Sequence, residues 1–300
     1  MAITQPTQTK HNAHTLIVIS GPTAVGKTTL ALQAALHFNT VILSADSRQC
    51  YKELNIGVAR PSIEELKSVP HYFIASHSIH DEINAAFYEN YALNLLNELF
   101  IRHNRIIVTG GTGLYIKALL EGLDEIPEIP QQTRNTIIQN YEANGIEWLQ
   151  NELKNKDPLF FAEGEIQNPQ RMMRALEVAE ATGKSIISFR NKEKIKRNFD
   201  ILQIGLELPR ETLYHNINNR VDAMIAAGLE AEVKNLLPKR HLNALQTVGY
   251  KEMFDYFDGN ISLAKAIELI KQNTRRYAKR QMTWFKKQPG IHWLNRATKA

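Results

Sequence analysis

The apolar residues of this 300-residue chain fall into two patterns that alternate along most of its length. Apolar side chains spaced three or four residues apart, as at Phe87, Tyr91 and Leu95, predict helices, and later helices are expected at residues 210–227, 229–237 and 262–282. Short uninterrupted runs predict buried strands at residues 16–19, 41–45, 72–75, 105–109, 201–206 and 291–294. Strands and helices that alternate in this way predict a parallel sheet with right-handed crossovers, the α/β fold class.

One long segment lacks strand-like runs. The acidic, proline-containing stretch at 124–130 interrupts regular structure, and residues 131–190 then carry only helical patterns. The clearest helix begins at Asn168-Pro169 and ends at Thr182-Gly183. Other helices are expected at 133–144 and around Trp148. We predict a helical insertion at 124–197, able to act as a lid, in a core formed by 14–123 and 198–300, after a disordered tail at 1–13.

Composition excludes several classes of protein. No apolar run reaches the length of a membrane span, and the polar first dozen residues lack the apolar segment of a signal peptide. Cys50 is the one cysteine of the sequence, so the chain has no internal disulfide and fits a reducing compartment. We therefore expect a cytoplasmic protein with no membrane contact.

The positive charge is concentrated near the C-terminus. The net charge is +5, and no acidic residue interrupts the basic residues Lys271, Arg275, Arg276, Lys279, Arg280, Lys286, Lys287, Arg296 and Lys299. Such a series is compatible with a solvated helix face and, equally, with a nucleic-acid surface.

The most specific motif follows the first predicted strand. It has the spacing of a phosphate-binding P-loop and comprises Gly21, Pro22, Thr23, Ala24, Val25, Gly26, Lys27 and Thr28. Its backbone N–H groups and the start of the following helix are expected to bind a phosphate or diphosphate. Lys27 would add a full charge and the Thr28 hydroxyl could ligate Mg²⁺. The motif makes the fold prediction specific: a P-loop NTPase-like parallel sheet with an inserted all-helical domain.

Two further groups are expected at the same edge of the sheet. Asp46 follows the second strand, and Thr112 lies in a glycine-rich turn after the strand at 105–109. An aspartate in this position is often a turn or helix cap, but here it would face the phosphate site. No later strand ends in the acid typical of ATP-hydrolysing motors, which argues mildly against that class.

With these pieces placed, the chain resembles the bacterial tRNA dimethylallyltransferases from Gly21 to about Phe285. The resemblance is carried by residues 21–28, 45–49, 110–115, 170–178, 213–214, 220–224, 228–229, 232–233, 249–251 and 274–281. The chain departs from the usual family pattern at Val58 and Arg60, where Thr and Lys are usual. It also departs at residues 71–75, which lack the second His and the closing Asp.

The resemblance implies transfer of a dimethylallyl group from dimethylallyl diphosphate to N6 of the adenosine 3′ of a tRNA anticodon. Asp46 would be the general base, Thr112 would orient the amine, and Arg220 would join the P-loop and Mg²⁺ in stabilising the diphosphate. The anticodon stem-loop would be held by Asp46, Ser47, Arg48, Gln49, Thr112, Arg134, Gln170, Arg171, Met172, Met173 and Arg174. A monomer is expected.

Three other functions remain open at this point. A P-loop kinase for a small metabolite fits the first hundred residues, but it accounts poorly for the helical insertion and the basic C-terminus. An adenylate isopentenyltransferase would use the same site on a free nucleotide. A non-catalytic RNA-binding protein would not need Asp46 beside an intact P-loop.

Overall fold

The computed structural model describes residues 13–190 and 194–296. The chain divides into two compact units, one formed by residues up to Glu121 together with those from Lys196, and a second formed by Gly122–Ile195. Of the tail expected at 1–13, residues 1–12 lie outside the described residues. Each unit is described separately below, and we refer to them as the core unit and the helical unit.

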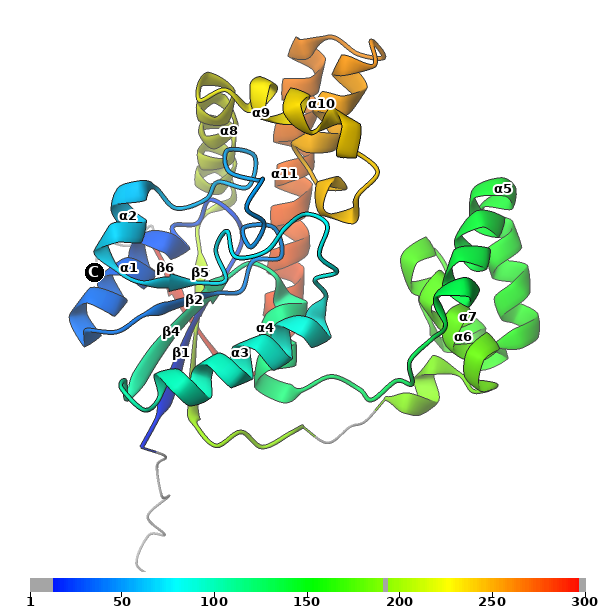
Figure 1. The fold of residues 1–300 in the computed structure, drawn as a ribbon, viewed down its shortest axis with the longest axis horizontal. Helices are drawn as coiled ribbons and strands as arrows, with labels where there is room; N and C mark the ends of the chain where they lie inside the picture. The colour runs from blue at the N-terminus through cyan, green and yellow to red at the C-terminus, as the bar shows by residue number, and fades with distance from the viewer. Residues whose placement is uncertain (1–12, 191–193, 297–300) are drawn as a thin grey trace, which may run out of the picture. The chain divides into compact units, whose positions relative to one another are not determined.

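The core unit is built on a parallel six-stranded sheet (Figure 1). Its order is β3-β2-β4-β1-β5-β6, and because all the paired strands are parallel, crossover connections must join them. The strands are β1 (Thr15–Ser20), β2 (Ile42–Ser44), β3 (His71–Tyr72), β4 (Arg105–Gly110), β5 (Asp200–Glu207) and β6 (Ile291–Asn295). The predicted α/β class with a parallel sheet is confirmed.

The predicted strand at 72–75 is wrong beyond its first residue. β3 ends at Tyr72 because Phe73 and Ala75 adopt left-handed backbone conformations, with φ of 62° and 47°. The Phe73 ring is buried against Tyr88 and Tyr91 of the helix α3 (Ala85–Leu99), with ring centroids 5.0 Å apart in both pairs. The apolar run therefore reflects a buried loop rather than a strand.

The helices of the core unit flank the sheet and carry most of the residues discussed below. β1 leads into α1 (Lys27–Phe38), and β4 leads into α4 (Gly113–Glu121). The remaining helices are α2 (Ile63–Ser68), α8 (Arg210–Ala226), α9 (Leu229–Leu236), α10 (Tyr250–Phe257) and α11 (Leu263–Lys286). One buried cluster joins Ile17 and Ile19 of β1 to Val25, Ile217 and Ala278. It holds the P-loop, α8 and α11 against the same strand.

The helical unit contains no strand among its described residues. Its long helix α5 (Gln131–Lys156) is interrupted at Gly145, whose φ of 74° is not helical, so it consists of two helices as the sequence predicts. α6 (Pro158–Glu163) follows, and α7 (Pro169–Thr182) begins at Asn168, whose side chain accepts a hydrogen bond from the Arg171 N–H. A short 3₁₀ turn, Ile186–Phe189, follows α7. α5, α6 and α7 bury their own core around Leu149, Phe160, Met172 and Leu176.

Candidate active site in the core unit

The P-loop joins β1 to α1 with its N–H groups available to an anion. Gly21, Ala24 and Gly26 all have positive φ, at 144°, 62° and 94°. A Cβ on Gly21 would lie 2.7 Å from the Leu206 carbonyl oxygen, so this position requires glycine. Among the described residues no side chain caps the start of α1, and its free N–H groups add to a positive helix end. The Arg296 guanidinium donates a hydrogen bond to the carbonyl oxygen of Gly26, the last residue before α1, over 2.9 Å.

Lys27 is held inside the loop before any ligand arrives. Its Nζ donates to the Pro22 carbonyl oxygen over 2.7 Å. Burial, and then repulsion by Arg220, lower the pKa of Lys27 from 10.5 to about 7, although Asp46 opposes the shift. The amine is therefore poised to gain a proton when a diphosphate supplies negative charge.

Asp46 lies just beyond β2, and its orientation is fixed by the backbone that follows it. Oδ1 accepts hydrogen bonds from the N–H groups of Arg48 (2.9 Å) and Gln49 (3.2 Å). The turn-capping role is therefore real, but both bonds use the same oxygen. Within the described part of the chain, this leaves Oδ2 as the oxygen that can accept a proton from a ligand.

The glycine-rich turn after β4 brings Thr112 to the residue that follows Asp46. Thr112 Oγ1 accepts from the Ser47 N–H over 3.0 Å and donates to Ser47 Oγ over 3.3 Å. A Cβ on Gly110 would lie 2.2 Å from the Ala45 carbonyl oxygen, so the two strand ends can approach this closely only with glycine there.

Arg220 enters the site from α8. Its Nη1 donates to Thr23 Oγ1 over 2.8 Å, which ties the guanidinium to the P-loop. Burial lowers the pKa of Arg220, while the Asp46 carboxylate acts in the opposite direction. The nearest acid on its own helix, Asp222, instead pairs with Lys271 at 2.6 Å. Among the described residues, Arg220 therefore has no ion-pair partner within α8.

Two cavities of about 440 and 480 Å³ meet at Asp46 and Arg220, and Thr112 lines neither of them. The first is lined by Gly26, Lys27 and Thr28 of the P-loop side. The second is lined by the segment from Gln246 to Gly249 and by the α11 residues Thr274 and Arg280. Both are lined by Thr23, Asp46, Val58, Ala59, Arg220 and Tyr277. A phosphate group in the first cavity and an acceptor in the second would face each other across Asp46.

Gln281 of α11 is a site residue that the sequence did not reveal as one. Its Oε1 accepts from the Thr23 N–H and its Nε2 donates to the Gly111 carbonyl, both over 2.9 Å. One buried amide thus ties the P-loop to the turn that carries Thr112. Its position in the helical pattern could have indicated this role. Gln281 lies on the same buried face of α11 as Ala278 and Phe285, and a polar side chain on a buried face needs a hydrogen-bond partner.

The basic series near the C-terminus is only partly free to bind RNA. Two of its lysines are paired with acids from other elements, Lys271 with Asp222 and Lys286 with Glu207, each at 2.6 Å. Arg275 donates to Asn218 of α8 over 2.7 Å. The exposed members in the middle of the helix are Arg276, Lys279 and Arg280. The sequence near the C-terminus, which has no acids, therefore overestimates the positive charge available to RNA, because acids from other elements neutralise part of it.

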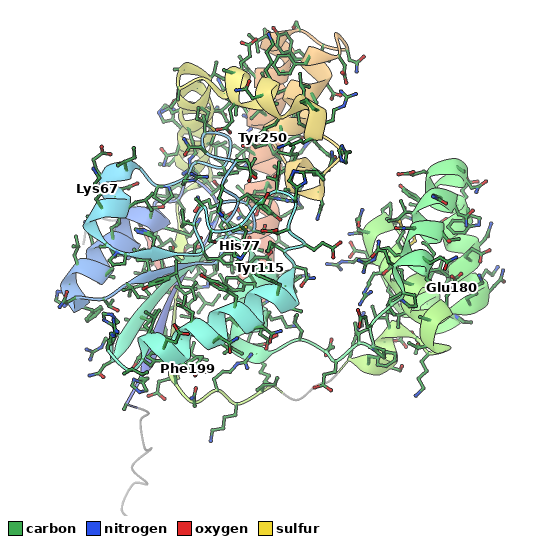
Figure 2. The ribbon with its side chains drawn as sticks, in the orientation of Figure 1. Lys67, His77, Tyr115, Glu180, Phe199 and Tyr250 are labelled. Carbon is green, nitrogen blue, oxygen red and sulfur yellow. The ribbon has the colours of Figure 1, made fainter. Side chains whose placement is uncertain are left out.

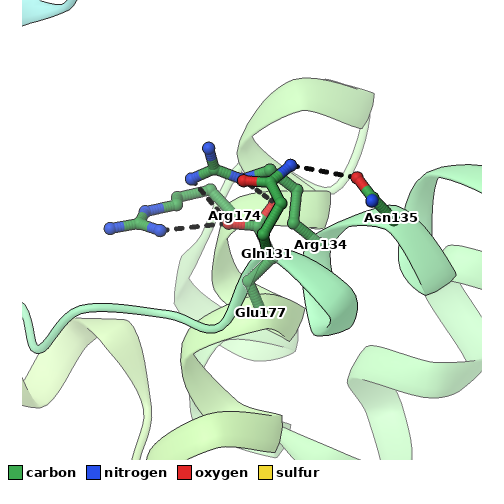
Figure 3. Close-up of polar contacts among 5 residues, drawn as sticks. All are labelled: Gln131, Arg134, Asn135, Arg174 and Glu177. Carbon is green, nitrogen blue, oxygen red and sulfur yellow. Dashed lines mark hydrogen bonds and ion pairs between the residues drawn. The ribbon is translucent and has the colours of Figure 1, made fainter.

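In the helical unit, Arg134 and Arg174 flank one buried carboxylate, that of Glu177 (Figure 3). The nitrogen–oxygen distances are 3.3 Å for Arg134 Nε and 3.0 Å for Arg174 Nη1. Two cations share one anion, so a net positive charge stays at this surface. Arg171 is more exposed and pairs with Glu165.

The prediction that places Met172 and Met173 on an RNA-binding surface needs correction. Their side chains are 0% and 7% exposed and form part of the core of the helical unit. Helical periodicity turns these two residues inward, while Gln170 and Arg171 stay exposed. Gln170 is therefore the uncharged residue of this stretch that can reach a ligand.

A divalent cation fits the first cavity only together with a phosphate ligand. The Thr28 hydroxyl and the Asp46 carboxylate both line it. No group of three or more His, Cys, Asp or Glu side chains that could hold a metal exists among the described residues. Mg²⁺ commonly uses one or two protein oxygens and completes its shell with phosphate oxygens and water, so this donor set suits it.

Comparison with known proteins identifies the family. The family model described as IPP transferase matches residues 49–288. The chain belongs to the IPP transferase family. It is 48% identical to a tRNA dimethylallyltransferase of Cytophaga hutchinsonii, over 93% of this chain and 92% of that protein. It is also 48% identical to tRNA dimethylallyltransferase 1 of Bacteroides thetaiotaomicron, over 94% and 91%.

Solved structures of family members share the fold. The tRNA isopentenylpyrophosphate transferase of Bacillus halodurans aligns with a TM-score of 0.68 at 35% identity, over 94% of this chain and 90% of that one. A eukaryotic dimethylallyltransferase, captured acting on tRNA, aligns with a TM-score of 0.79 at 28% identity, over 94% and 74%. Within the described residues, no helix is both long and apolar enough to span a bilayer.

Proposed function

We propose that this protein transfers the dimethylallyl group of dimethylallyl diphosphate to N6 of the adenosine 3′ of a tRNA anticodon, with release of diphosphate. The observation that carries the proposal is the junction of two cavities at Asp46. One cavity is built for a diphosphate, and the other is open to an acceptor. The relatives compared above are named tRNA dimethylallyltransferases, which supports the same reaction for this protein.

The chemical step needs a base because the adenine amine is a poor nucleophile, with its lone pair delocalised into the ring. As nitrogen attacks the first carbon of the donor, the C–N bond forms and the bond from that carbon to the diphosphate oxygen breaks. Asp46 Oδ2 takes the proton that the amine loses. A positioned carboxylate contributes roughly 10²–10⁴-fold to such a step. Thr112, which is fixed to Ser47, would orient the amine through its hydroxyl.

The departing diphosphate gains negative charge that the P-loop side is arranged to stabilise. The N–H groups at the start of α1, the Lys27 ammonium and the Arg220 guanidinium surround the first cavity. These donors are in place before the reaction, so little reorganisation is needed. Mg²⁺, held by Thr28 and phosphate oxygens, would supply further charge neutralisation at the leaving group.

The acceptor base must leave the stack of the anticodon loop to reach Asp46, a base-flipping step. Ser47 and Arg48 line the second cavity, where the base would bind, and Gln49 lines the first. Arg134, Gln170, Arg171 and Arg174 of the helical unit, and the exposed cations of α11, would contact the RNA backbone. We expect a monomeric enzyme in the cytoplasm.

The test is an acceptor competition. Labelled dimethylallyl diphosphate and Mg²⁺ are incubated with an anticodon stem-loop RNA or with AMP, and label is followed into each acceptor. A matched RNA with guanosine at the target position is the control. We expect label in the adenosine-containing RNA alone. Efficient labelling of AMP would instead indicate an adenylate isopentenyltransferase. Phosphoryl transfer from ATP to a small acceptor would indicate a kinase.

A further inference from the structure

Val58 and Ala59 occupy a place that the catalytic residues do not account for. They are the two aliphatic residues among the six that line both cavities. The reacting carbon of a prenyl diphosphate has to lie between its diphosphate and the attacking amine. The hydrocarbon part of the donor would then lie where the cavities meet, beside Val58, Ala59 and Tyr277.

The wall formed by these two residues is fixed by a carboxylate that binds backbone N–H groups. Glu232 of α9 accepts from the N–H groups of Asn55 (3.2 Å), Ile56 (2.7 Å) and Gly57 (3.0 Å). Tyr250, labelled in Figure 2, donates its hydroxyl to the same carboxylate over 2.6 Å.

Close packing adds to this restraint. A Cβ on Gly57 would lie 2.6 Å from the Tyr250 ring, so the loop lies directly against that ring. Arg60 holds the other end of the loop by donating to the carbonyl oxygens of Tyr51 (2.8 Å) and Lys52 (3.0 Å). A loop restrained at both ends cannot readily move to accommodate a larger or more polar donor.

Three of the backbone polar groups of the wall are already in use, namely the two carbonyl oxygens and the Ala59 N–H. Gln49 Nε2 donates to the carbonyl oxygens of Val58 (3.2 Å) and Ala59 (3.0 Å), and the Ala59 N–H donates to the Ile56 carbonyl (3.0 Å). The nearby Thr23 hydroxyl is engaged by Arg220. A hydroxyl group on the hydrocarbon part of a donor would lose its water here and meet the aliphatic side chains of Val58 and Ala59, whose carbonyl oxygens are already bonded to Gln49.

We propose that Val58 makes this enzyme selective for an unhydroxylated prenyl diphosphate over the same donor with a hydroxyl on a terminal methyl. The inference rests on the proposed function, because it assumes that a prenyl diphosphate is the donor. An apolar pocket rejects an analogue that merely adds a hydroxyl by up to about 100-fold, and we expect a preference of about 10- to 100-fold. Threonine at this position has nearly the same shape and supplies a hydrogen-bond partner, so Val58→Thr should reduce the preference about tenfold.

The experiment measures donor binding first, without RNA. Titration calorimetry with Mg²⁺ compares dimethylallyl diphosphate and its hydroxylated analogue on the wild-type protein, Val58→Thr and Val248→Thr. Val248 lines only the second cavity, so the same chemical change there should leave the ratio of the two affinities unaltered. The same ratio is then measured as kcat/KM with the stem-loop RNA as acceptor. Thermal melting checks that both variants are folded.

The outcomes separate the two proposals. A preference in the wild type that falls in Val58→Thr and persists in Val248→Thr supports the role of Val58. Equal affinities in the wild type, an unchanged ratio in Val58→Thr, or an equal change in both variants would overturn it. Donor selectivity in the binding experiment without any transfer to RNA would contradict the proposed acceptor and leave the role of Val58 supported.

Discussion

The cations of the P-loop site and those of the helical unit have different kinds of partner. Lys27 and Arg220 are bound to a backbone carbonyl and a hydroxyl, and burial lowers the pKa of both. Arg134, Arg171 and Arg174 are partly or largely exposed and paired with glutamates. The first pair is arranged for one small, highly charged ligand. In the second group, Arg171 can exchange its exposed carboxylate partner for a phosphate at little cost. Arg134 and Arg174 keep the buried Glu177 as their partner and have further guanidinium N–H groups for a phosphate, which suits a large and variable surface such as RNA.

Removing the acid between the cavities should have the largest effect. Asp46→Asn keeps the shape of the side chain and can still accept from the N–H groups of Arg48 and Gln49, but it cannot take up a proton at neutral pH. We expect kcat to fall by roughly 10²–10⁴-fold, with tRNA affinity changed far less. Single-turnover rates and a filter-binding assay measure the two quantities. Near-normal turnover in the variant would assign the base to another residue.

Lys27→Met should weaken donor binding by roughly 10- to 100-fold, because a charge-assisted contact with the diphosphate is lost. The same change should stabilise the fold. The pKa of Lys27 is about 7 in the folded protein and 10.5 ordinarily, so between these values the unfolded chain binds more protons. The free energy of unfolding of the wild type therefore rises with pH across this window. The destabilisation caused by burying a protonated Lys27 is greatest below pH 7.

The variant lacks this penalty, so near pH 7 we expect its free energy of unfolding to exceed that of the wild type by about 1–4 kcal/mol. The difference should shrink as the pH approaches 10. Chemical denaturation at several pH values measures it, with Lys67→Met at the exposed end of α2 as the control. A difference that does not depend on pH would contradict the assignment to Lys27.

Gln281→Leu tests whether the P-loop and the turn that carries Thr112 are held together by this side chain. Both of its hydrogen bonds to backbone groups are lost, so we expect a destabilisation of about 1–3 kcal/mol. We also expect KM for the donor to rise several-fold. Steady-state kinetics alongside thermal melting separate these effects, and Gln288→Leu just beyond α11 is the matched control. A lower melting temperature with unchanged KM would mean that Gln281 only stabilises the fold.

The smallest expected effect lies in the helical unit. Arg171→Ala removes an exposed guanidinium whose ion pair with Glu165 contributes little to stability. We expect weaker tRNA binding and a salt dependence of log K reduced by roughly 0.7–0.9, with donor affinity unchanged. Lys154→Ala removes an equal charge from α5 as the control. An unchanged salt slope would exclude Arg171 from the RNA contact and so weaken the contrast between the two regions.

The sequence predicted those features that depend on nearby residues. The P-loop, the position of Asp46 after a strand, and the start of α7 at Asn168 all follow from local patterns. The contacts of Gln281 with Thr23 and of Glu232 with residues 55–57 join segments separated by 258 and about 175 residues, and no local pattern reveals them. Phe73 was misplaced because a buried loop and a buried strand have the same apolar composition. Met172 and Met173 were grouped with neighbouring arginines although helical periodicity separates them.

The hydrogen bond between Thr23 and Gln281 also bears on how the protein is made. The P-loop leaves the ribosome before its partner, which is translated 258 residues later. At about 5–20 residues per second, roughly 10–50 s pass between them. Throughout that interval the nascent chain carries a complete phosphate-binding sequence without the helix that fixes its geometry. A chain that terminates early would lack this contact, so incomplete products should bind the donor poorly and compete little for it.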